Sequence, residues 1–243
     1  MNRTVVITGA SRGLGLALAC QFINQGDVVF GISRTKRHWN AAYNLVSNSK
    51  HLILTCADIS RETVVKNFLA KIKKQTNHID ILINNAGYGG VLSRIEDLKL
   101  AEFRKHLDQN LLSAFLMCKY FIPRMRRQKS GLIFNIASMA GKRAVPRLVA
   151  YSASKFGILA LTQAIAKENL DTPIKCITVC PGGMNTKMRS DLFGKEDAIR
   201  QQSVDFVASI VLQITNNKIR LETGSDITIR HSKVADIHVP PTN

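Results

Sequence analysis

The sequence lacks an uninterrupted apolar run of about 18 residues, the length that a membrane-spanning helix needs, and we expect no membrane partner. Proline is also scarce, with six residues in 243, so few positions must interrupt a helix or a strand. Met1-Asn2-Arg3 leads directly into a short apolar run that ends at Gly9, so we expect no signal peptide. Apolar residues make up 45% of the chain, which is enough for a sizeable core.

Cysteine is scattered and odd in number, which argues against a disulfide framework. The five residues are Cys20, Cys56, Cys118, Cys176 and Cys180. They lie mostly within apolar segments, so we expect reduced core thiols in a cytoplasmic protein. Metal ligands are lacking as well. Cys176 and Cys180 have no second pair, and the six histidines show no ligand spacing.

Acidic residues are half as frequent as basic ones: 17 Asp and Glu stand against 34 Lys and Arg, a net charge of +17. Such a surplus favours anionic partners, namely a nucleotide phosphate, an acidic carrier protein or nucleic acid. No aromatic interleaving and no nucleic-acid motif accompanies the basic clusters, so we expect no nucleic-acid partner. The cluster from Arg124 to Lys129 is either solvated surface or a docking site for an acidic carrier.

The sequence does contain a regular alternation of β-branched runs and helical stretches. The predicted strands lie near residues 4–8, 28–32, 51–55, 79–83, 132–136, 174–179 and 227–229. The predicted helices lie near 14–25, 39–46, 61–75, 98–127 with one break, from 151 onward, and near 203–213. Near-continuous apolar strands separated by helices indicate a parallel sheet covered on both faces. We therefore predict one α/β dinucleotide-binding domain over residues 1–243, with a doubly wound, seven-stranded, mostly parallel Rossmann-like sheet.

The first strand turns into the first helix through the stretch Thr8-Gly9-Ala10-Ser11-Arg12-Gly13-Leu14-Gly15. Glycine allows a tight turn and the close approach of a pyrophosphate, whose charge the helix N-terminal amides attract. The spacing G-x-x-x-G-x-G differs from the commoner G-x-G-x-x-G fingerprint, and a glycine-containing turn without a ligand is the alternative. The predicted cofactor-binding residues of this turn are Gly9, Ser11, Arg12, Gly13, Leu14 and Gly15.

The second strand ends at Ile32-Ser33-Arg34, without the acidic residue that bonds a ribose 2′-hydroxyl. An arginine is suited instead to a 2′-phosphate, which it grips through paired donors. Arg12 could reach the same phosphate, and a surface role for either arginine is the alternative. Ser33 and Arg34 therefore favour NADP over NAD as the cofactor.

A further helix is expected to begin near Tyr151, in the stretch Tyr151-Ser152-Ala153-Ser154-Lys155. Residues at i and i+4 share one helix face, so the phenol of Tyr151 and the ammonium of Lys155 point the same way. A lysine charge beside a phenol lowers the phenol pKa, and such a pair exchanges protons with an alcohol or a ketone. On its own, the spacing is more typical of a surface helix pair.

Several motifs occur in order between about residues 3 and 188. They are Thr8 to Gly15, Asn84-Asn85-Ala86-Gly87, Asn110, Ser138, Tyr151 with Lys155, and Pro181-Gly182 with Thr186. In this order and spacing the chain resembles the short-chain dehydrogenases/reductases, and it is most similar to their 3-oxoacyl-[acyl-carrier-protein] reductase type. The resemblance implies an NADP-dependent oxidoreductase that interconverts a ketone and a secondary alcohol by hydride transfer. Its substrate would be a small carbonyl compound or one carried on an acyl-carrier or CoA thioester.

The resemblance also implies a role for each matched residue. Tyr151 would give a proton to the carbonyl oxygen, and Lys155 would bind the nicotinamide ribose and lower the pKa of Tyr151. Ser138 would hydrogen-bond the substrate oxygen, and Asn110 would hold a water that relays protons through Lys155. Further implied cofactor contacts are Asp58 and Ile59 at the adenine, Asn85, Ala86 and Gly87 at the ribose, and Pro181, Gly182, Met184 and Thr186 near the carboxamide. The implied substrate contacts are Ser138, Met139, Tyr151 and Phe193.

The chain departs from the family pattern after Thr186. The stretch from Lys187 to Gly194 is short and basic, and the usual proline-arginine-glycine segment that follows it is absent. The stretch from Thr228 to Lys233 replaces a paired-glycine ending, and the tail to Asn243 is unfamiliar. We expect a substrate lid near residues 183–205 and a homodimer or homotetramer. The alternative function is a catalytically silent NADP-binding regulatory module.

Overall fold

The structure, a computed structural model, describes residues 2–241. Its strands are β1 (Thr4–Thr8), β2 (Val28–Ser33), β3 (Leu52–Cys56), β4 (Ile81–Asn84), β5 (Gly131–Ile136), β6 (Ile174–Pro181), β7 (Asp226–Arg230) and β8 (Lys233–His238). Its α-helices are α1 (Gly13–Asn24), α2 (Trp39–Leu45), α3 (Glu62–Lys73), α4 (Leu100–His106), α5 (Ser113–Gln128), α6 (Val149–Lys167), α7 (Lys187–Phe193), α8 (Lys195–Ile199) and α9 (Val204–Thr215). Each strand and helix expected from the sequence is present within a few residues of its predicted place.

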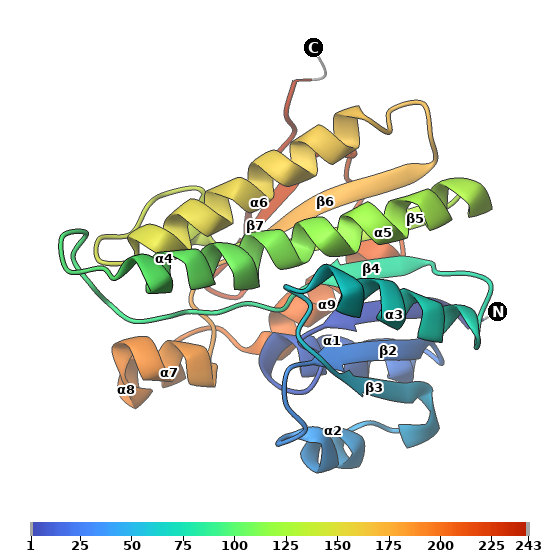
Figure 1. Cartoon of the computed structure of the whole chain (residues 1–243), viewed down its shortest axis with the longest axis horizontal. Coiled ribbons are helices and arrows are strands. Elements are labelled where there is room, and N and C mark those ends of the chain that lie inside the picture. Colours follow the sequence, from blue (N-terminus) through green and yellow to red (C-terminus); the bar gives the residue numbers. More distant parts are fainter. Residues whose placement is uncertain (1, 242–243) are drawn as a thin grey trace.

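The strands form one sheet in the order β3-β2-β1-β4-β5-β6-β7-β8 (Figure 1). All neighbouring strands from β3 to β7 run parallel, which confirms the doubly wound α/β fold. The chain leaves β1 towards β2 on one side and later returns to β4 on the other. A crevice opens at the carboxyl ends of the strands at such a switch point, and ligands of open α/β sheets bind there.

The predicted count of seven strands is wrong by one, because the sheet has eight strands and β8 pairs antiparallel with β7. The chain reverses through His231 and Ser232, whose φ angles are +50° and +52°. Two successive positive φ angles are typical of a tight hairpin turn, but glycine or asparagine usually occupies them. Most side chains of β8 are also exposed, so neither turn chemistry nor a buried apolar pattern marks this strand in the sequence.

Alternate side chains of the strands pack into two apolar layers, one on each face of the sheet. In β1, Val5 and Ile7 pack on the side of α1 and α9, whereas Val6 packs on the side of α3 and α5. Ile165 of α6 joins the second layer. The helices α3, α5 and α6 therefore cover the face nearest the viewer in Figure 1, and α1 and α9 cover the other.

The long helical region predicted near 98–127 is interrupted by a π turn. This turn spans Leu107–Leu112 and joins α4 to α5 without a loop. One-turn π segments inside helices are rare and occur frequently at functional sites. Asn110 is the buried residue of the turn, 2% exposed, and its amide is directed at α6 through a hydrogen bond to Ser154.

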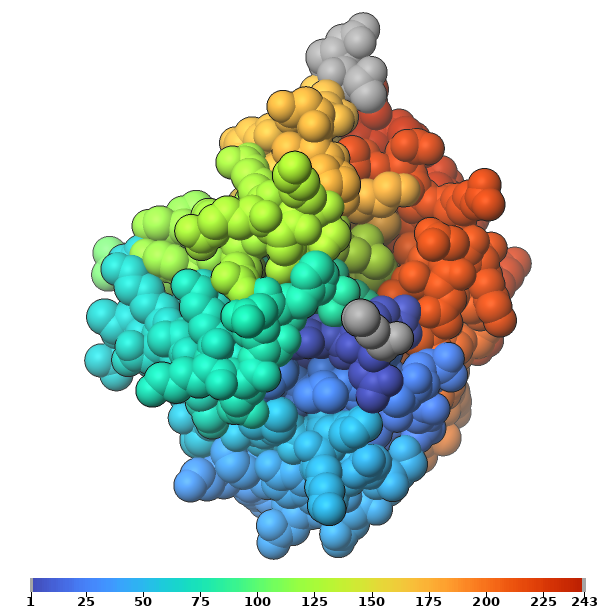
Figure 2. Space-filling view, turned by 90° about the vertical axis from the view of Figure 1, so that its right-hand side faces the viewer, coloured from blue at the N-terminus to red at the C-terminus, as the bar shows by residue number. Residues whose placement is uncertain are grey.

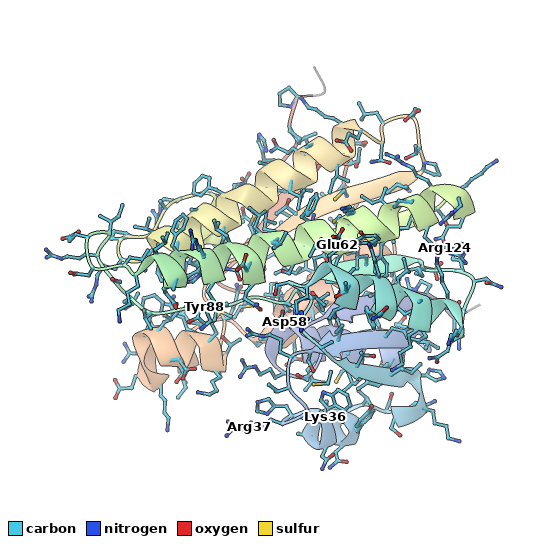
Figure 3. The ribbon with its side chains drawn as sticks, viewed as in Figure 1. Lys36, Arg37, Asp58, Glu62, Tyr88 and Arg124 are labelled. Atoms are coloured by element: carbon cyan, nitrogen blue, oxygen red, sulfur yellow. The ribbon has the colours of Figure 1, made fainter. Side chains whose placement is uncertain are left out.

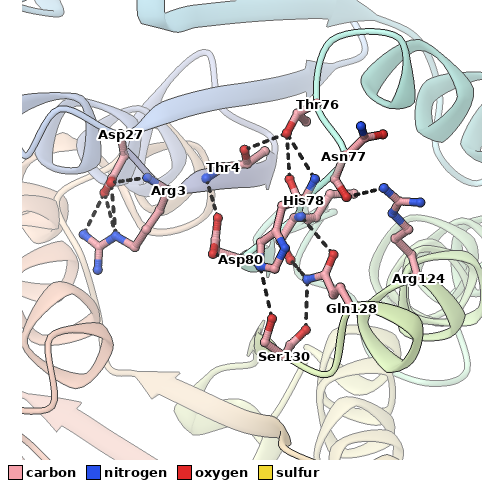
Figure 4. Close-up of polar contacts among 11 residues, drawn as sticks. Arg3, Thr4, Asp27, Thr76, Asn77, His78, Asp80, Arg124, Gln128 and Ser130 are labelled. Carbon is pink, nitrogen blue, oxygen red and sulfur yellow. Dashed lines mark hydrogen bonds and ion pairs between the residues drawn. The ribbon is translucent and has the colours of Figure 1, made fainter. Parts of the chain in front are cut away.

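The opposite, amino-terminal edge of the sheet is closed by polar contacts (Figure 4). Arg3 pairs with Asp27 at 2.7 Å between Nη2 and Oδ2, and the Thr4 amide donates to Asp80 Oδ2 at 2.7 Å. Figure 2 faces this end of the molecule, where segments from the start, the middle and the end of the chain meet. These contacts tie the segments at this edge together, and we call it the closed edge.

The basic cluster from Arg124 to Lys129 lies at this closed edge. It forms the end of α5, directly before β5 begins at Gly131. Arg124 donates to the Asn77 carbonyl, and Arg126 donates to Asn169 Oδ1 at 2.9 Å. In Figure 3, Arg124 lies on the right near the end of α5, whereas Tyr88 lies on the left near α4. Two of the cluster's side chains thus make structural contacts, and the cluster is remote from the crevice at the carboxyl ends of the strands.

Candidate active site

A cavity of about 430 Å³ opens at the carboxyl ends of β1, β2, β4 and β5. Its walls come from the segments that follow these strands and β3, from the π turn, from α6, and from the segment between β6 and α7 together with the start of α7. The predicted site residues that it brings together are Gly9, Ser11, Arg12, Gly13, Leu14, Gly15, Ser33, Arg34, Ile59, Asn85, Ala86, Gly87, Tyr151, Lys155, Met184 and Thr186. Residues from widely separated parts of the sequence therefore line one space, as a site for an extended ligand requires.

The glycine-rich turn shapes one end of the cavity. Gly9 and Gly13 have φ angles of +71° and +54°, which other residues rarely adopt. A Cβ on Gly15 would lie only 2.2 Å from the Gly9 carbonyl oxygen, so the turn and α1 pack without room for a side chain. The start of α1, which receives no side-chain cap from the described residues, borders the cavity. Its free amides and partial positive charge fit a pyrophosphate.

A basic corner lies beside this turn. Arg12 and Arg34 line it as predicted, and the structure adds Arg37 and His38. Trp39 Nε1 donates to Ser33 Oγ at 3.0 Å and so ties the end of β2 to α2. Figure 3 shows Arg37 and Lys36 on the segment that leads into α2. The run of basic residues from 34 to 37 was visible in the sequence, but only the fold shows which of them reach the cavity.

Thr8, for which no function was predicted, holds the segment after β4 that lines the middle of the cavity. Its hydroxyl oxygen accepts hydrogen bonds from the amides of Asn85 and Ala86, both at 2.9 Å. Asn85 Nδ2 donates back to the Thr8 carbonyl at 2.9 Å. The segment after β4 is thereby held against the end of β1. A threonine at the end of a strand is common, so the sequence offered no specific signal for this function.

Asp58 lies next to the cavity but does not line it, whereas its neighbour Ile59 does. Its carboxylate accepts from the Ser60 amide at 3.0 Å and from the Ser60 hydroxyl at 2.8 Å. Partial burial opposes ionisation of Asp58, but these bonds, with Gln109 and the nearby charge of Arg34, lower its pKa below the usual value. Asp58 is therefore an ionised residue that shapes the turn after β3.

Lys155 is almost fully buried, with 4% of its surface exposed. Its ammonium donates to the Ile136 carbonyl at the end of β5, with an Nζ–O distance of 2.8 Å. Burial lowers the pKa of Lys155 to about 8, because the fold removes the charged ammonium from water. A charged lysine at this place is thus costly, which is typical of functional lysines.

Tyr151 lies at the cavity wall, one helical turn before Lys155. Burial raises the pKa of Tyr151, and a hydrogen bond with Ser138 lowers it, with a net shift upward. The lowering of this pKa by Lys155 that the sequence led us to expect is therefore not observed. The reason is geometric: Lys155 Nζ is bonded to β5 and lies 5.8 Å from the centroid of the Tyr151 ring. The phenol consequently remains protonated at neutral pH, as a proton donor must.

Asn110 lies behind the cavity wall and links three elements. Its Oδ1 accepts from the Tyr88 amide at 2.6 Å, and its Nδ2 donates to the Tyr88 carbonyl at 3.1 Å and to Ser154 Oγ at 2.9 Å. Ser154 Oγ donates in turn to the Tyr151 carbonyl at 2.7 Å. We call this chain of bonds the Asn110 brace. It joins the segment after β4 to the first turn of α6, where Tyr151 lies.

Several predicted residues lie outside the cavity lining. Besides Asp58 and Asn110 they are Ser138, Met139, Pro181, Gly182 and Phe193. Phe193 packs beneath the Arg189 guanidinium, 4.0 Å from Cζ to the ring centroid. Instead, Met188 and Leu192 of α7 cover the segment after β4, because a Cβ on Gly89 would lie 2.7 Å from Met188 Cγ and 3.2 Å from Leu192 Cδ1. The sequence did not single out either of these two residues.

The segment from Met184 to Gln202 forms a loop with a fixed base. Met184 and Gln202 pair as an isolated β-bridge, and Gln202 Nε2 donates to the Ile229 carbonyl at 2.9 Å. Between these ends, Arg189 of α7 pairs with Asp197 of α8. Thr186 caps α7 near the start of the loop, and its Cγ2 lies across from the glycine turn, 3.8 Å from the place of a Cβ on Gly13. The loop therefore stands over the cavity while its base is anchored to the sheet.

Within residues 2–241, no group of three or more His, Cys, Asp or Glu side chains could hold a metal ion. No helix in the same part of the chain is long and apolar enough to cross a bilayer. Cys118, Cys176 and Cys180 are buried free thiols, as expected, but Cys20 is half-buried and Cys56 is exposed.

Comparison with known proteins places these features in context. Residues 3–197 match the family described as short chain dehydrogenase. A curated relative, the NADPH-dependent pterin aldehyde reductase of Arabidopsis thaliana, is 30% identical over 230 residues, which cover 93% of each chain.

The fold is also similar to those of solved reductase structures. Levodione reductase superposes with a TM-score of 0.88 at 26% identity, covering 94% of this chain and 96% of its own. A 3-ketoacyl-(acyl-carrier-protein) reductase from Brucella melitensis, complexed with NADH, superposes with a TM-score of 0.86 at 25% identity, covering 93% and 96%.

Proposed function

The chain belongs to the short-chain dehydrogenase/reductase family of oxidoreductases, and we propose that it interconverts a ketone and a secondary alcohol with NADP as its cofactor. The chief support is that Tyr151 and Lys155 line the same cavity as the glycine-rich turn. The tight glycine turn, the free start of α1 and the basic corner fit a dinucleotide phosphate. Such a cofactor would supply the hydride.

The residues around Tyr151 perform the proton transfer. The phenol, kept neutral by burial, donates its proton to the carbonyl oxygen as negative charge develops there. Ser138, which bonds with this phenol, holds the same oxygen. The positive charge of Lys155, 5.8 Å from the Tyr151 ring centroid, favours the resulting phenolate, and its ammonium would also hold the cofactor's ribose.

Asn110 and Lys155 both border the place opposite Gly87 at which a proton-relaying water would sit. A Cβ on Gly87 would lie 3.4 Å from Asn110 Oδ1 and 3.7 Å from Lys155 Nζ. This space is therefore within reach of both polar atoms, and the absence of a side chain at Gly87 leaves it open. We propose that Asn110 has two functions, the relay and the brace.

The segment near 183–205 is the substrate lid of a single dinucleotide-binding domain in this proposal. It contributes Met184 and Met188 to the cavity. Methionine is flexible and apolar, so it adapts to substrates of varied shape. The lid therefore favours an apolar carbonyl substrate, with Met139 and Phe193 brought closer when the lid closes.

The test of this function is a carbonyl and alcohol substrate panel followed by NADPH absorbance, run in parallel with NADH. Turnover with NADPH supports the proposal. NADPH binding without turnover across the whole panel would favour a silent regulatory module instead.

Cofactor choice is tested by Arg34→Glu. We expect this change to lower kcat/KM for NADPH by about 10- to 100-fold, the effect of losing one charge-assisted contact and adding repulsion. The value for NADH should fall less or rise, because NADH has no 2′-phosphate. Arg127→Glu, which removes a basic side chain at the closed edge, is the matched control. Equal losses with both cofactors would contradict a 2′-phosphate contact.

A thioester-carried substrate is a narrower form of the proposal. It is supported by the likeness to the 3-ketoacyl-(acyl-carrier-protein) reductase and by the net charge of +17. The cluster from Arg124 to Lys129 is the candidate docking surface for an acidic carrier, and Arg124 and Arg126 in it also bond Asn77 and Asn169. Comparing KM for a carrier-bound ketone with KM for its small analogue decides between the two substrate classes.

We also propose a cytoplasmic homodimer or homotetramer. Phe115 of α5 and Phe156 of α6 are 42% and 44% exposed on neighbouring helices, and Leu112 between α4 and α5 is 37% exposed. Exposed apolar side chains on adjacent helices are typical of subunit interfaces. Sedimentation velocity should give a dimer or tetramer mass, and Phe115→Lys with Phe156→Lys should reduce it to the monomer. An unchanged mass would exclude this face.

A further inference from the structure

A buried histidine adjoins the catalytic tyrosine but has no part in the proton transfer described above. His106 ends α4 and is only 2% exposed. Its ring meets the Tyr151 ring edge-on, with centroids 6.1 Å apart, and lies 4.9 Å from the Tyr88 ring centroid. Gly90 makes room for it, since a Cβ there would lie 2.1 Å from His106 Nε2. A titratable side chain is thus enclosed between the segment after β4, α4 and α6.

The two nitrogens of His106 face groups of opposite character. Nδ1 lies 3.5 Å from Asn110 Nδ2, and Nε2 lies 3.7 Å from Glu102 Oε1. The orientation of the Asn110 amide is determined, because its Oδ1 accepts from the Tyr88 amide at 2.6 Å. Nδ2 is therefore a donor group, and its two hydrogens are directed at the Tyr88 carbonyl and at Ser154 Oγ. Its 3.5 Å approach to His106 Nδ1 is a weak, shared contact that a lone pair on Nδ1 fits and an N–H group does not. The contact with Asn110 favours a neutral imidazole with its proton on Nε2, the nitrogen that faces Glu102.

Protonation would reverse the contact with Asn110. An imidazolium has N–H groups on both nitrogens, so Nδ1–H would face the Nδ2 donor of Asn110. The same amide holds Tyr88 and Ser154, and Ser154 holds the Tyr151 carbonyl. Repulsion at Nδ1 therefore acts on the brace that positions Tyr151.

We propose that His106 is a positioning residue: as the neutral imidazole it packs against the intact Asn110 brace, and its protonation in acid loosens the brace and slows turnover. The inference rests on the proposed function, because turnover is what the brace supports. It adds a pH-sensitive element to the site.

The charged and titratable groups around His106 come from all three neighbouring elements. From α4 these are Glu102 and Lys105, from the segment after β4 the phenol of Tyr88, and from α6 Tyr151 and Lys155. Tyr88 donates its hydroxyl to Glu102 Oε1 at 2.7 Å, and Lys105 Nζ lies 4.1 Å from the Tyr88 ring centroid. Burial lowers the pKa of His106, Glu102 raises it, and Lys105 and Lys155 lower it, with a net shift below 6.5. The neutral form therefore prevails at neutral pH.

The test compares wild type with His106→Asn and His106→Leu. Asparagine can place an acceptor near the position of Nδ1 but does not titrate, whereas leucine removes the acceptor. Between about pH 8 and about pH 5, we expect kcat of wild type to fall about tenfold more than kcat of His106→Asn. His106→Leu should have a lowered kcat at every pH and no such acid loss. His78→Asn, at the closed edge, is the matched control and should keep the wild-type profile.

Two further measurements distinguish unfolding of a variant and failure of the proposed function from failure of the inference about His106. Near-UV circular dichroism at each pH shows that the variants stay folded. Side-chain NMR of the protein without substrate should show the Asn110 amide shifting with the His106 titration in wild type. The inference is overturned if the wild-type and His106→Asn profiles coincide or if the Asn110 amide does not respond. If wild type shows no turnover at all, the proposed function fails, and the NMR titration still decides whether His106 acts on the brace.

Discussion

Tyr151→Phe is expected to lower kcat/KM for carbonyl reduction by about 10²- to 10⁴-fold, the range that one positioned proton donor contributes. The phenol lies at the cavity wall and bonds with Ser138, and burial keeps it protonated. Phenylalanine keeps the aromatic ring that packs on His106, so the loss reports the hydroxyl alone. Initial rates from NADPH absorbance measure the effect, and NADPH Kd from fluorescence should change far less.

Tyr120→Phe is the control for this change. Tyr120 donates its hydroxyl to Glu62 on the surface of α3, outside the cavity lining. Removing that hydroxyl should leave turnover unchanged. Full NADPH-linked activity of Tyr151→Phe on a substrate of the wild type would remove Tyr151 from the mechanism.

Lys155→Met is expected to abolish most turnover and yet to stabilise the protein without cofactor. Lys155 is buried, and its pKa is about 8 instead of 10.5. This difference means that the buried charge destabilises the folded protein by about 3 kcal/mol. Losing the hydrogen bond to Ile136 costs ~1 kcal/mol, so we expect a net gain of about 2 kcal/mol in the free energy of unfolding near neutral pH. Turnover should fall at least about 100-fold.

The pH dependence of this gain follows from the direction of the pKa shift. The folded protein holds the Lys155 proton less tightly than the unfolded chain, so the cost of the buried charge is complete below about pH 8. It shrinks as pH rises from about 8 and is gone above about 10.5. Urea unfolding near pH 7 and again near pH 9.5 measures the difference between wild type and variant. Lys119→Met, which removes an exposed partner of Glu62, should show no comparable gain. A destabilised Lys155→Met would mean that Lys155 is held by more than its bond to Ile136.

The coupling of lost activity with gained stability is the expected signature of a functional residue. A buried lysine with one backbone acceptor contributes little to the fold that methionine could not. In the function proposed above, its presence is explained by the proton chemistry beside Tyr151. The unfolding measurement therefore tests the cost of the buried Lys155 charge independently of any substrate.

Much of the fold was predictable from the sequence because its signals are local. The alternation of apolar strands and helices predicted a mostly parallel sheet. The glycines at 9, 13 and 15 marked the turn into α1, and positive φ angles at two of them confirm why glycine is needed there. Arg34 and the missing acid after β2 pointed to the basic corner. Each of these features depends on residues close together in the chain.

Other features depended on contacts between distant residues. The strand β8 is mostly exposed, and it forms because β7 offers a free edge for pairing. The pKa of Tyr151 rises rather than falls, because burial acts on the phenol while the Lys155 ammonium is bonded to β5. The i, i+4 spacing of Tyr151 and Lys155 alone could not show whether the pKa of Tyr151 rises or falls.

The sequence by itself determined the family, the glycine-rich turn and the Tyr151–Lys155 pair, since these are set by residue type and spacing along one strand or helix. The tertiary structure decided what surrounds the pair. A π turn brings Asn110 between Tyr88 and Ser154, and His106 next to it, only when α4, α6 and the segment after β4 pack together. The brace, the enclosed histidine and the state of the phenol are products of burial and of long-range hydrogen bonds, which no local pattern contains.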